Sequence, residues 1–181
     1  MAVINTLQAF VQTALALSFI FIAAFSGLEV IPERAKLEYV NEKYFYNLSV
    51  NVKRYSRSSS YYFNIEMTTK HVWTNNVTLH LIFNEYLHNE YQSSFIQLHH
   101  RFCDIIKYDK FIGTMVKQVG LECPMPAGTL QLMNFTLSLD KFPNVFPFQK
   151  CRVDAEVTIT ATNESMAAMC FYVSFKDTKR T

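Results

Sequence analysis

The sequence predicts a mainly β fold, a two-sheet antiparallel sandwich with one short helix. Three observations predict it. Apolar and polar residues alternate with a period of two in several short segments, turn-forming residues separate those segments, and apolar residues recur at helical spacing in one further segment. Because side chains along a strand point alternately to opposite faces of a sheet, each alternating segment has one apolar face to bury.

Two strands are predicted in the first half of the chain, at residues 47–53 and 61–67. In both, every second residue is apolar. The apolar series are Leu48, Val50 and Val52 in the first strand, and Tyr61, Phe63, Ile65 and Met67 in the second. The polar stretch between them predicts a loop, in which Arg54 and Arg57 either contact a ligand head group or are simply solvated.

A hairpin is predicted next, because Asn75-Asn76 favours a tight turn after Trp73. The alternation that follows the turn is Val77, Leu79, Leu81 and Phe83. Further strands are predicted at residues 130–139, 153–160 and 169–175, with a turn at 163–165 before the last of them.

The helix is predicted between residues 105 and 119. Its apolar positions are Ile105, Tyr108, Ile112, Met115 or Val116, and Val119. Gly120 supplies a residue that commonly ends a helix.

Residues 1–26 predict a signal peptide. They carry no charged side chain, and the apolar run 14–25 is too short to span a bilayer comfortably. Small residues suit cleavage after Ser26 or after Ala24. The expected organisation is a signal peptide at 1–26 and one domain at 27–181 in a secreted, extracellular protein, with an uncleaved membrane anchor as the alternative.

Charge and motifs exclude several classes of function. Lys and Arg number 17 against 15 Asp and Glu, so the chain is too balanced to predict a nucleic-acid partner. None of the common catalytic or nucleotide-binding motifs is present. His99 and His100 would point to opposite faces of a strand, which makes them a poor metal clamp. We therefore expect no enzyme activity, no cofactor and no metal site.

Four Asn-X-Ser/Thr triplets predict glycosylation on at least one site in a secreted chain. They begin at Asn47, Asn76, Asn134 and Asn163.

Three segments of the second half resemble the ML lipid-recognition domain, in its ganglioside-activator branch. They are 102–106 (FCDII), 119–128 (VGLECPMPAG) and 170–174 (CFYVS). The resemblance covers roughly residues 102 to 176. Within this branch, the chain resembles above all the insect chemosensory secreted family of the CheA/CheB type. It implies an immunoglobulin-like sandwich whose sheets splay into a lipid-binding cup over 27–181, and a binder of lipids or hydrophobic signals rather than a catalyst.

The resemblance also implies a disulfide between Cys103 and Cys123. Four cysteines in an oxidising compartment are expected to pair. By elimination Cys151 pairs with Cys170, although Cys151 stands where the family more often has an aromatic residue. A free Cys151 or an intermolecular link is the alternative.

The functional hypothesis is a secreted carrier of a lipid, cuticular hydrocarbon or pheromone-like molecule in insect chemosensation or lipid handling. Its partners would be that ligand and a chemosensory receptor or membrane surface. The alternative is a surface-interaction protein whose core is filled. Trp73 would sit at the rim of the cup or plug the core. The expected cavity wall is Phe63, Ile65, Met67, Trp73, Leu79, Leu81, Val157, Ile159, Phe171 and Val173.

Overall fold

The computed structural model of the chain describes residues 28–57, 59–109, 112–118, 120–136 and 148–177. The expected signal peptide at 1–26 lies outside these residues. The strands are β1 (Leu28–Val40), β2 (Phe45–Arg54), β3 (Tyr61–Thr69), β4 (Val77–Leu87), β5 (Glu90–Arg101), β6 (Gly128–Phe135), β7 (Lys150–Ile159) and β8 (Ser165–Asp177).

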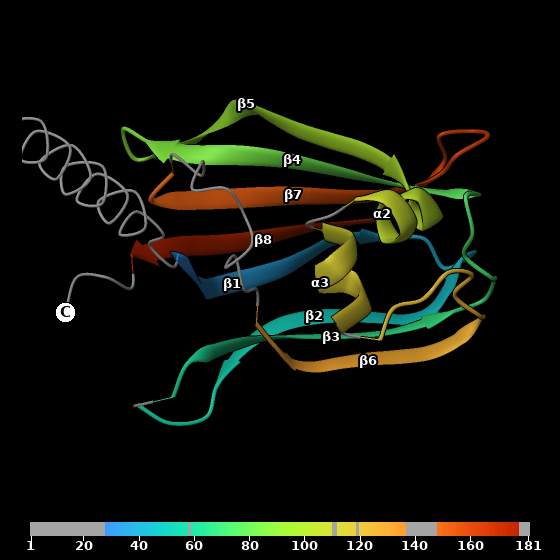
Figure 1. The fold of residues 1–181 in the computed structure, drawn as a ribbon, viewed down its shortest axis with the longest axis horizontal. Coiled ribbons are helices and arrows are strands. Elements are labelled where there is room, and N and C mark those ends of the chain that lie inside the picture. The colour runs from blue at the N-terminus through green and yellow to red at the C-terminus, as the bar shows by residue number, and fades with distance from the viewer. Residues whose placement is uncertain (1–27, 58, 110–111, 119, 137–147, 178–181) are drawn as a thin grey trace, which may run out of the picture.

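These strands form two antiparallel sheets, which confirms the predicted fold class (Figure 1). The large sheet has the strand order β1-β8-β7-β4-β5, and the small sheet has the order β2-β3-β6. Within the large sheet, β1 is the strand beside the small sheet, next to β2 (Figure 1). The other edge strands, β5 of the large sheet and β6 of the small sheet, lie at the top and bottom of Figure 1, with α2 and α3 drawn between them.

The helical region consists of two seven-residue helices, α2 (Phe102–Tyr108) and α3 (Ile112–Gln118). At Asp109 the backbone is extended, with φ −77° and ψ 119°, so the predicted continuous apolar stripe is interrupted. As a result Tyr108 is 76% exposed, whereas Ile105 is buried. Gly113 allows the two helices to meet, because a Cβ atom there would lie 2.4 Å from the carbonyl oxygen of Ile105.

The alternating residues lie on the inner faces of the two sheets, as the sequence predicts. The register aligns them in rows that run across the strands. In the small sheet the rows are Leu48–Met67–Leu130, Val50–Ile65–Leu132 and Val52–Phe63–Phe135. In the large sheet the corresponding rows across β4 and β7 are Leu79–Val157, Leu81–Ala155 and Phe83–Val153.

Two separate clusters of buried side chains make up the core. The first cluster lies at the end of the sandwich that carries the helices, and it contains Tyr44, Phe45, Leu48, Met67, Trp73, Val77, Phe102, Cys103, Ile106, Met125, Val157, Met166 and Ala167. The second cluster contains Val30, Phe63, Phe148, Cys151 and Val173. In the second cluster the two sheets touch, since the Phe63 and Phe171 rings are 5.5 Å apart in an edge-to-face contact.

Candidate functional site

Between the two clusters lies a band of inward-facing apolar side chains that belongs to neither of them. We call it the middle row, and it consists of Val50, Ile65 and Leu132 in the small sheet and Leu98, Leu81 and Ala155 in the large sheet. Of the rows on either side of it, those on one side belong to the first cluster or pack against it, and those on the other side do the same with the second cluster. The register therefore places the middle row halfway along the sandwich.

The middle row is less buried than the clusters on either side of it. Five of its six side chains keep part of their surface accessible, although they point inward. The sixth, Ala155, is 8% exposed and is the smallest of the row. Within the large sheet the same row continues to Met169 and Leu37, which pack against the first cluster. Apolar surface that faces inward without being covered is what a hydrophobic ligand would need.

The ten residues expected to form a cavity wall divide into three groups in the structure. Ile65 and Leu81 lie in the middle row. The members of the first cluster, or those that pack against it, are Met67, Trp73, Leu79, Val157 and Ile159. Phe63, Phe171 and Val173 belong to the second cluster or pack against it.

Four residues of the middle row were not among those expected. Val50 and Ala155 are part of alternating segments of the sequence, and Leu132 lies in a predicted strand. A signal for these three was therefore present. Leu98 lies on β5, for which the sequence shows no clean alternation. Between the pairs Ile82–Gln97 and Asn84–Ser93, β5 has three residues where β4 has one, so two extra residues interrupt the period.

Trp73 is a core residue and does not lie at a rim. It is 4% exposed, and its backbone pairs with Met125 in an isolated bridge. Its ring makes edge-to-face contacts with Phe45, at 6.0 Å between centroids, and with Phe102, at 5.4 Å. Trp73 thus joins the β3–β4 connection to β2 and to α2.

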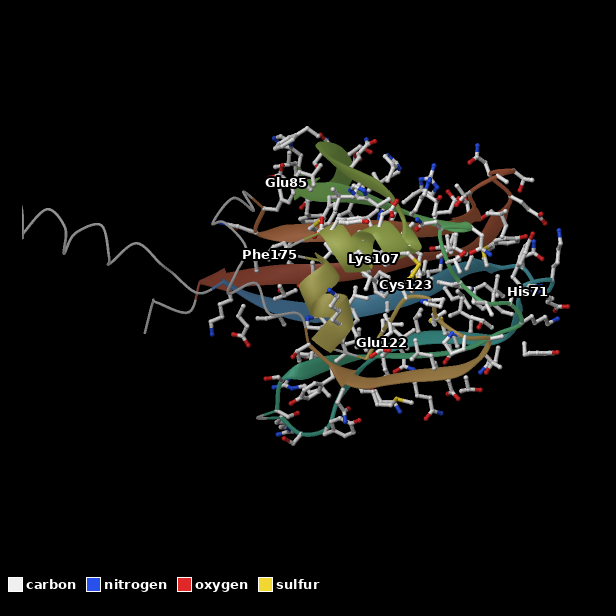
Figure 2. All side chains as sticks on the ribbon, turned by 45° about the vertical axis from the view of Figure 1, so that its right-hand side comes forward. His71, Glu85, Lys107, Glu122, Cys123 and Phe175 are labelled. Atoms are coloured by element: carbon white, nitrogen blue, oxygen red, sulfur yellow. A yellow bond between two sulfur atoms is a disulfide. The ribbon has the colours of Figure 1, made fainter. Side chains whose placement is uncertain are left out.

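The predicted disulfide between Cys103 and Cys123 is confirmed. It links α2 to the segment before β6, with 5.4 Å between the two Cα atoms, and it closes a loop of 20 residues. Figure 2 shows it as the yellow bond beside Cys123, next to α2. The disulfide therefore holds the helices against the first cluster.

The expected pairing of Cys151 with Cys170 is wrong, and both are free thiols. In the β7–β8 ladder Cys151 lies opposite Val173, and Cys170 lies opposite Asp154. Since neighbouring positions alternate in facing, the two thiols lie on opposite faces of the sheet. Burial raises the pKa of Cys151 to about 11, and burial together with the nearby Asp154 carboxylate raises that of Cys170 to about 12. Both therefore remain protonated and unreactive at neutral pH.

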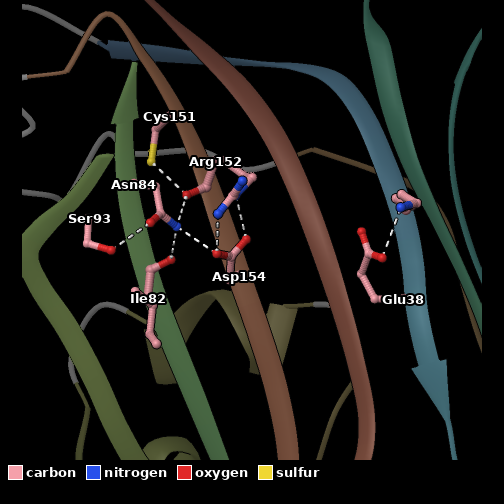
Figure 3. A network of polar contacts seen from close by, with 8 residues as sticks. Glu38, Ile82, Asn84, Ser93, Cys151, Arg152 and Asp154 are labelled. Atoms are coloured by element: carbon pink, nitrogen blue, oxygen red, sulfur yellow. Dashed lines mark hydrogen bonds and ion pairs between the residues drawn. The ribbon is translucent and has the colours of Figure 1, made fainter. Parts of the chain in front are cut away.

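The outer face of the large sheet carries a polar network around Asn84, a residue 3% exposed (Figure 3). Its amide nitrogen donates to Asp154 Oδ2 at 2.8 Å and to the Ile82 and Arg152 carbonyl oxygens at 3.3 Å, while Ser93 Oγ donates to its amide oxygen at 3.1 Å. Arg152 and Asp154 form an ion pair, with 2.7 Å between Nε and Oδ1. The side-chain amide of Asn84 on β4 is therefore fully paired, and its hydrogen bonds link β4 to β5 through Ser93 and to β7 through Arg152 and Asp154.

The histidine doublet divides between the two faces, as expected. His99 faces outward, where its Nδ1 lies 2.8 Å from Nδ1 of His80, and His100 pairs with the inward-facing Leu79. Within the described ranges, no three His, Cys, Asp or Glu side chains are grouped so that they could hold a metal ion. Among the helices that the structure describes, none is long and apolar enough to cross a membrane.

All four asparagines of the glycosylation triplets are exposed. Asn47 lies on the outer side of β2, and Asn163 lies in the β7–β8 turn with φ 55°. The Asn76 amide nitrogen donates to the Val72 carbonyl oxygen at 3.2 Å. The side-chain oxygen of Asn134 accepts a hydrogen bond from the Tyr55 hydroxyl at 2.6 Å. N-glycosylation of Asn76 would replace one of the two hydrogens on the amide nitrogen that donates to Val72.

No family model matches the chain, and no curated protein matches it. Among solved structures, the chain is similar to the crystal structure of chicken MD-1 complexed with lipid IVa, at 13% sequence identity and a TM-score of 0.36. The similarity covers 81% of this chain and 89% of the MD-1 chain. The fold class of this protein rests on its own sheets and their registers.

Proposed function

We propose that this protein is a non-catalytic carrier of a small hydrophobic ligand, held between the two sheets at the middle row. The observation that carries the proposal is that five of these six inward-facing side chains are partly exposed and that none of the six belongs to either core cluster. Burying each methylene contributes about 0.8 kcal/mol, so a tail of about ten methylenes gains about 8 kcal/mol before the cost of association. Such a site needs no charged contact to bind tightly.

The proposal includes membership of the ML lipid-recognition family, in the ganglioside-activator branch and of the insect chemosensory type. The segments 102–106, 119–128 and 170–174 support it. The ligand would then be a lipid, cuticular hydrocarbon or pheromone-like molecule, and a chemosensory receptor or membrane surface would be the partner.

Secretion is part of the same proposal, with residues 1–26 as a cleaved signal peptide and 27–181 as the lipid-binding domain. Protein collected from the medium of insect cells should begin near Gly27 and lose mass on glycosidase treatment. The exposed Asn47 and Asn163 are the favoured glycan sites. Amino-terminal sequencing that finds Met1 in membrane-embedded protein would contradict secretion.

Ligand binding is tested directly with the secreted protein. We expect a neutral fluorescent probe, N-phenyl-1-naphthylamine, to bind with enhanced emission and to be displaced by long-chain lipids. Native mass spectrometry of the same preparation should find a co-purified lipid. No probe binding, together with a native mass equal to that of the glycosylated chain alone, would defeat the carrier proposal.

A surface-interaction protein with a filled core is the second candidate. The observation that favours it is Phe95, which is 84% exposed on the edge strand β5. Exposed aromatic side chains are common anchors of protein interfaces. Under this alternative, Phe95→Ser would abolish partner binding while the protein bound no lipid probe.

A further inference from the structure

Two buried polar atoms have no partner, one on Trp73 in the first cluster and one on Thr69, which pairs with the cluster residue Phe45. Among the buried side-chain atoms that the structure describes, Thr69 Oγ1 and Trp73 Nε1 have neither a hydrogen-bond partner nor an ion pair. Thr69 is 2% exposed and Trp73 is 4% exposed. Buried polar atoms are nearly always paired, so two unpaired atoms on neighbours of Phe45 require an explanation.

The two residues that carry these atoms are both neighbours of Phe45. Thr69 pairs with Phe45 across the β2–β3 ladder, and the Phe45 ring lies 6.0 Å from the Trp73 ring. Thr69 is also two residues beyond Met67, and four beyond Ile65, on the inner face of β3. At about 3.3 Å per residue, Ile65 of the middle row is roughly 13 Å from Thr69 along the strand.

The other buried polar side chains make the contrast clear. Of the described residues, the buried polar ones are Asn64, Thr69, Asn84 and Thr158, and none of them is charged. Asn64 accepts a hydrogen bond from the Asn134 backbone, Asn84 is paired on all sides, and Thr158 Oγ1 lies 2.9 Å from His80 Nε2. Thr69 is the member of this set without a partner, and it is the one that faces the first cluster.

The side chains around the two atoms are of a kind that can rearrange. Met67, Met125 and Met166 belong to the first cluster, and Met169 packs against it. Methionine is unbranched and polarizable, so it fills irregular space and adapts when a guest enters. The second cluster is made instead of Phe and Val side chains with Cys151, and no methionine belongs to it among the described residues.

We propose that the first cluster binds the neutral, oxygen-bearing end of the ligand, an alcohol, carbonyl or ester oxygen, through Trp73 Nε1 and Thr69 Oγ1. This inference rests on the proposed carrier function. The indole N–H only donates, so the ligand atom must accept, while the threonine hydroxyl can donate or accept. A carboxylate is disfavoured, because no buried cation of the described residues would pair with it. The ligand class is therefore an oxygenated neutral lipid rather than a plain hydrocarbon.

The test measures displacement of N-phenyl-1-naphthylamine by hexadecane, hexadecan-1-ol and hexadecanoic acid, which share one chain length. We expect the alcohol to bind about tenfold tighter than the alkane, as one or two hydrogen bonds allow. At pH 8 the ionised acid should bind more weakly than the alcohol. Equal affinities for alkane and alcohol, or a preference for the acid, would overturn the inference while leaving the carrier function standing. Failure of the probe itself to bind would instead overturn the carrier function.

Paired threonine variants locate the effect. Thr69→Val, which keeps the shape and removes the unpaired hydroxyl, should abolish most of the preference for the alcohol and leave the unfolding midpoint of the empty protein unchanged or higher. Thr158→Val removes a paired hydroxyl on the outer face, so it should lower the midpoint and keep the preference. Trp73→Phe, which removes the indole N–H, should also reduce the preference for the alcohol over the alkane. If Thr69→Val instead lowers the unfolding midpoint of the empty protein, the Thr69 hydroxyl already has a hydrogen-bond partner there, such as a bound water. That result would overturn the inference.

Discussion

Ala155→Phe should abolish ligand binding at little cost in stability, whereas Ala167→Phe should destabilise the protein. Both alanines lie on the inner face of the large sheet, and both substitutions add the same atoms. Ala155 lies in the middle row, between Leu81 and Met169 on the neighbouring strands. Ala167 is 0% exposed within the first cluster. Overpacking a filled site typically costs about 1–3 kcal/mol, while a free space accepts the ring.

The measurement combines thermal unfolding with the probe assay. One kcal/mol corresponds to about 2–4 °C in a chain of this size, so Ala167→Phe should lower the midpoint by about 2–12 °C. Ala155→Phe should leave the midpoint nearly unchanged and reduce probe affinity at least tenfold, because the ring occupies the space of the ligand. If both variants are destabilised alike, the middle row is filled, and the surface-interaction alternative is favoured.

Removing the disulfide should produce the second large effect. The Cys103→Ala/Cys123→Ala variant should lose roughly 3 kcal/mol of stability, because closing a 20-residue loop restricts the unfolded chain. The Cys170→Ser variant, on the half-buried outer face, is the matched control and should change stability by less than about 0.5 kcal/mol. Denaturant unfolding of the secreted proteins gives both values.

Counting thiols on the same samples checks the free cysteines. The denatured, unreduced protein should contain two thiols per chain, those of Cys151 and Cys170. The disulfide variant should also contain two, and the Cys170→Ser control should contain one. A count of zero in the unmodified protein would contradict the free thiols and return Cys151 and Cys170 to a disulfide.

The sequence by itself determined the fold class and the inward faces of most strands. Period-two alternation is a direct consequence of strand geometry, so residues such as Phe63, Leu81 and Phe171 could be assigned to inner faces without knowing their neighbours. The two edge strands of the large sheet, β1 and β5, were not predicted from the sequence. Both contain register shifts, at Pro32/Arg34 and Leu37/Tyr39 in β1 and opposite Phe83 in β5, and such bulges break the period.

Only the tertiary structure decided what stands opposite each inward side chain. Alternation assigns Val157 and Ala155 to the same face, but Val157 lies in the first cluster and Ala155 in the middle row. That difference depends on the separation of the sheets, which no local pattern encodes. The same holds for Cys151 and Cys170, because their facing depends on the register of β7 with β8, and a shift of one residue would exchange the faces. The unpaired Thr69 hydroxyl likewise became visible only once its surroundings were known, since hydrogen-bond partners come from strands distant in the chain.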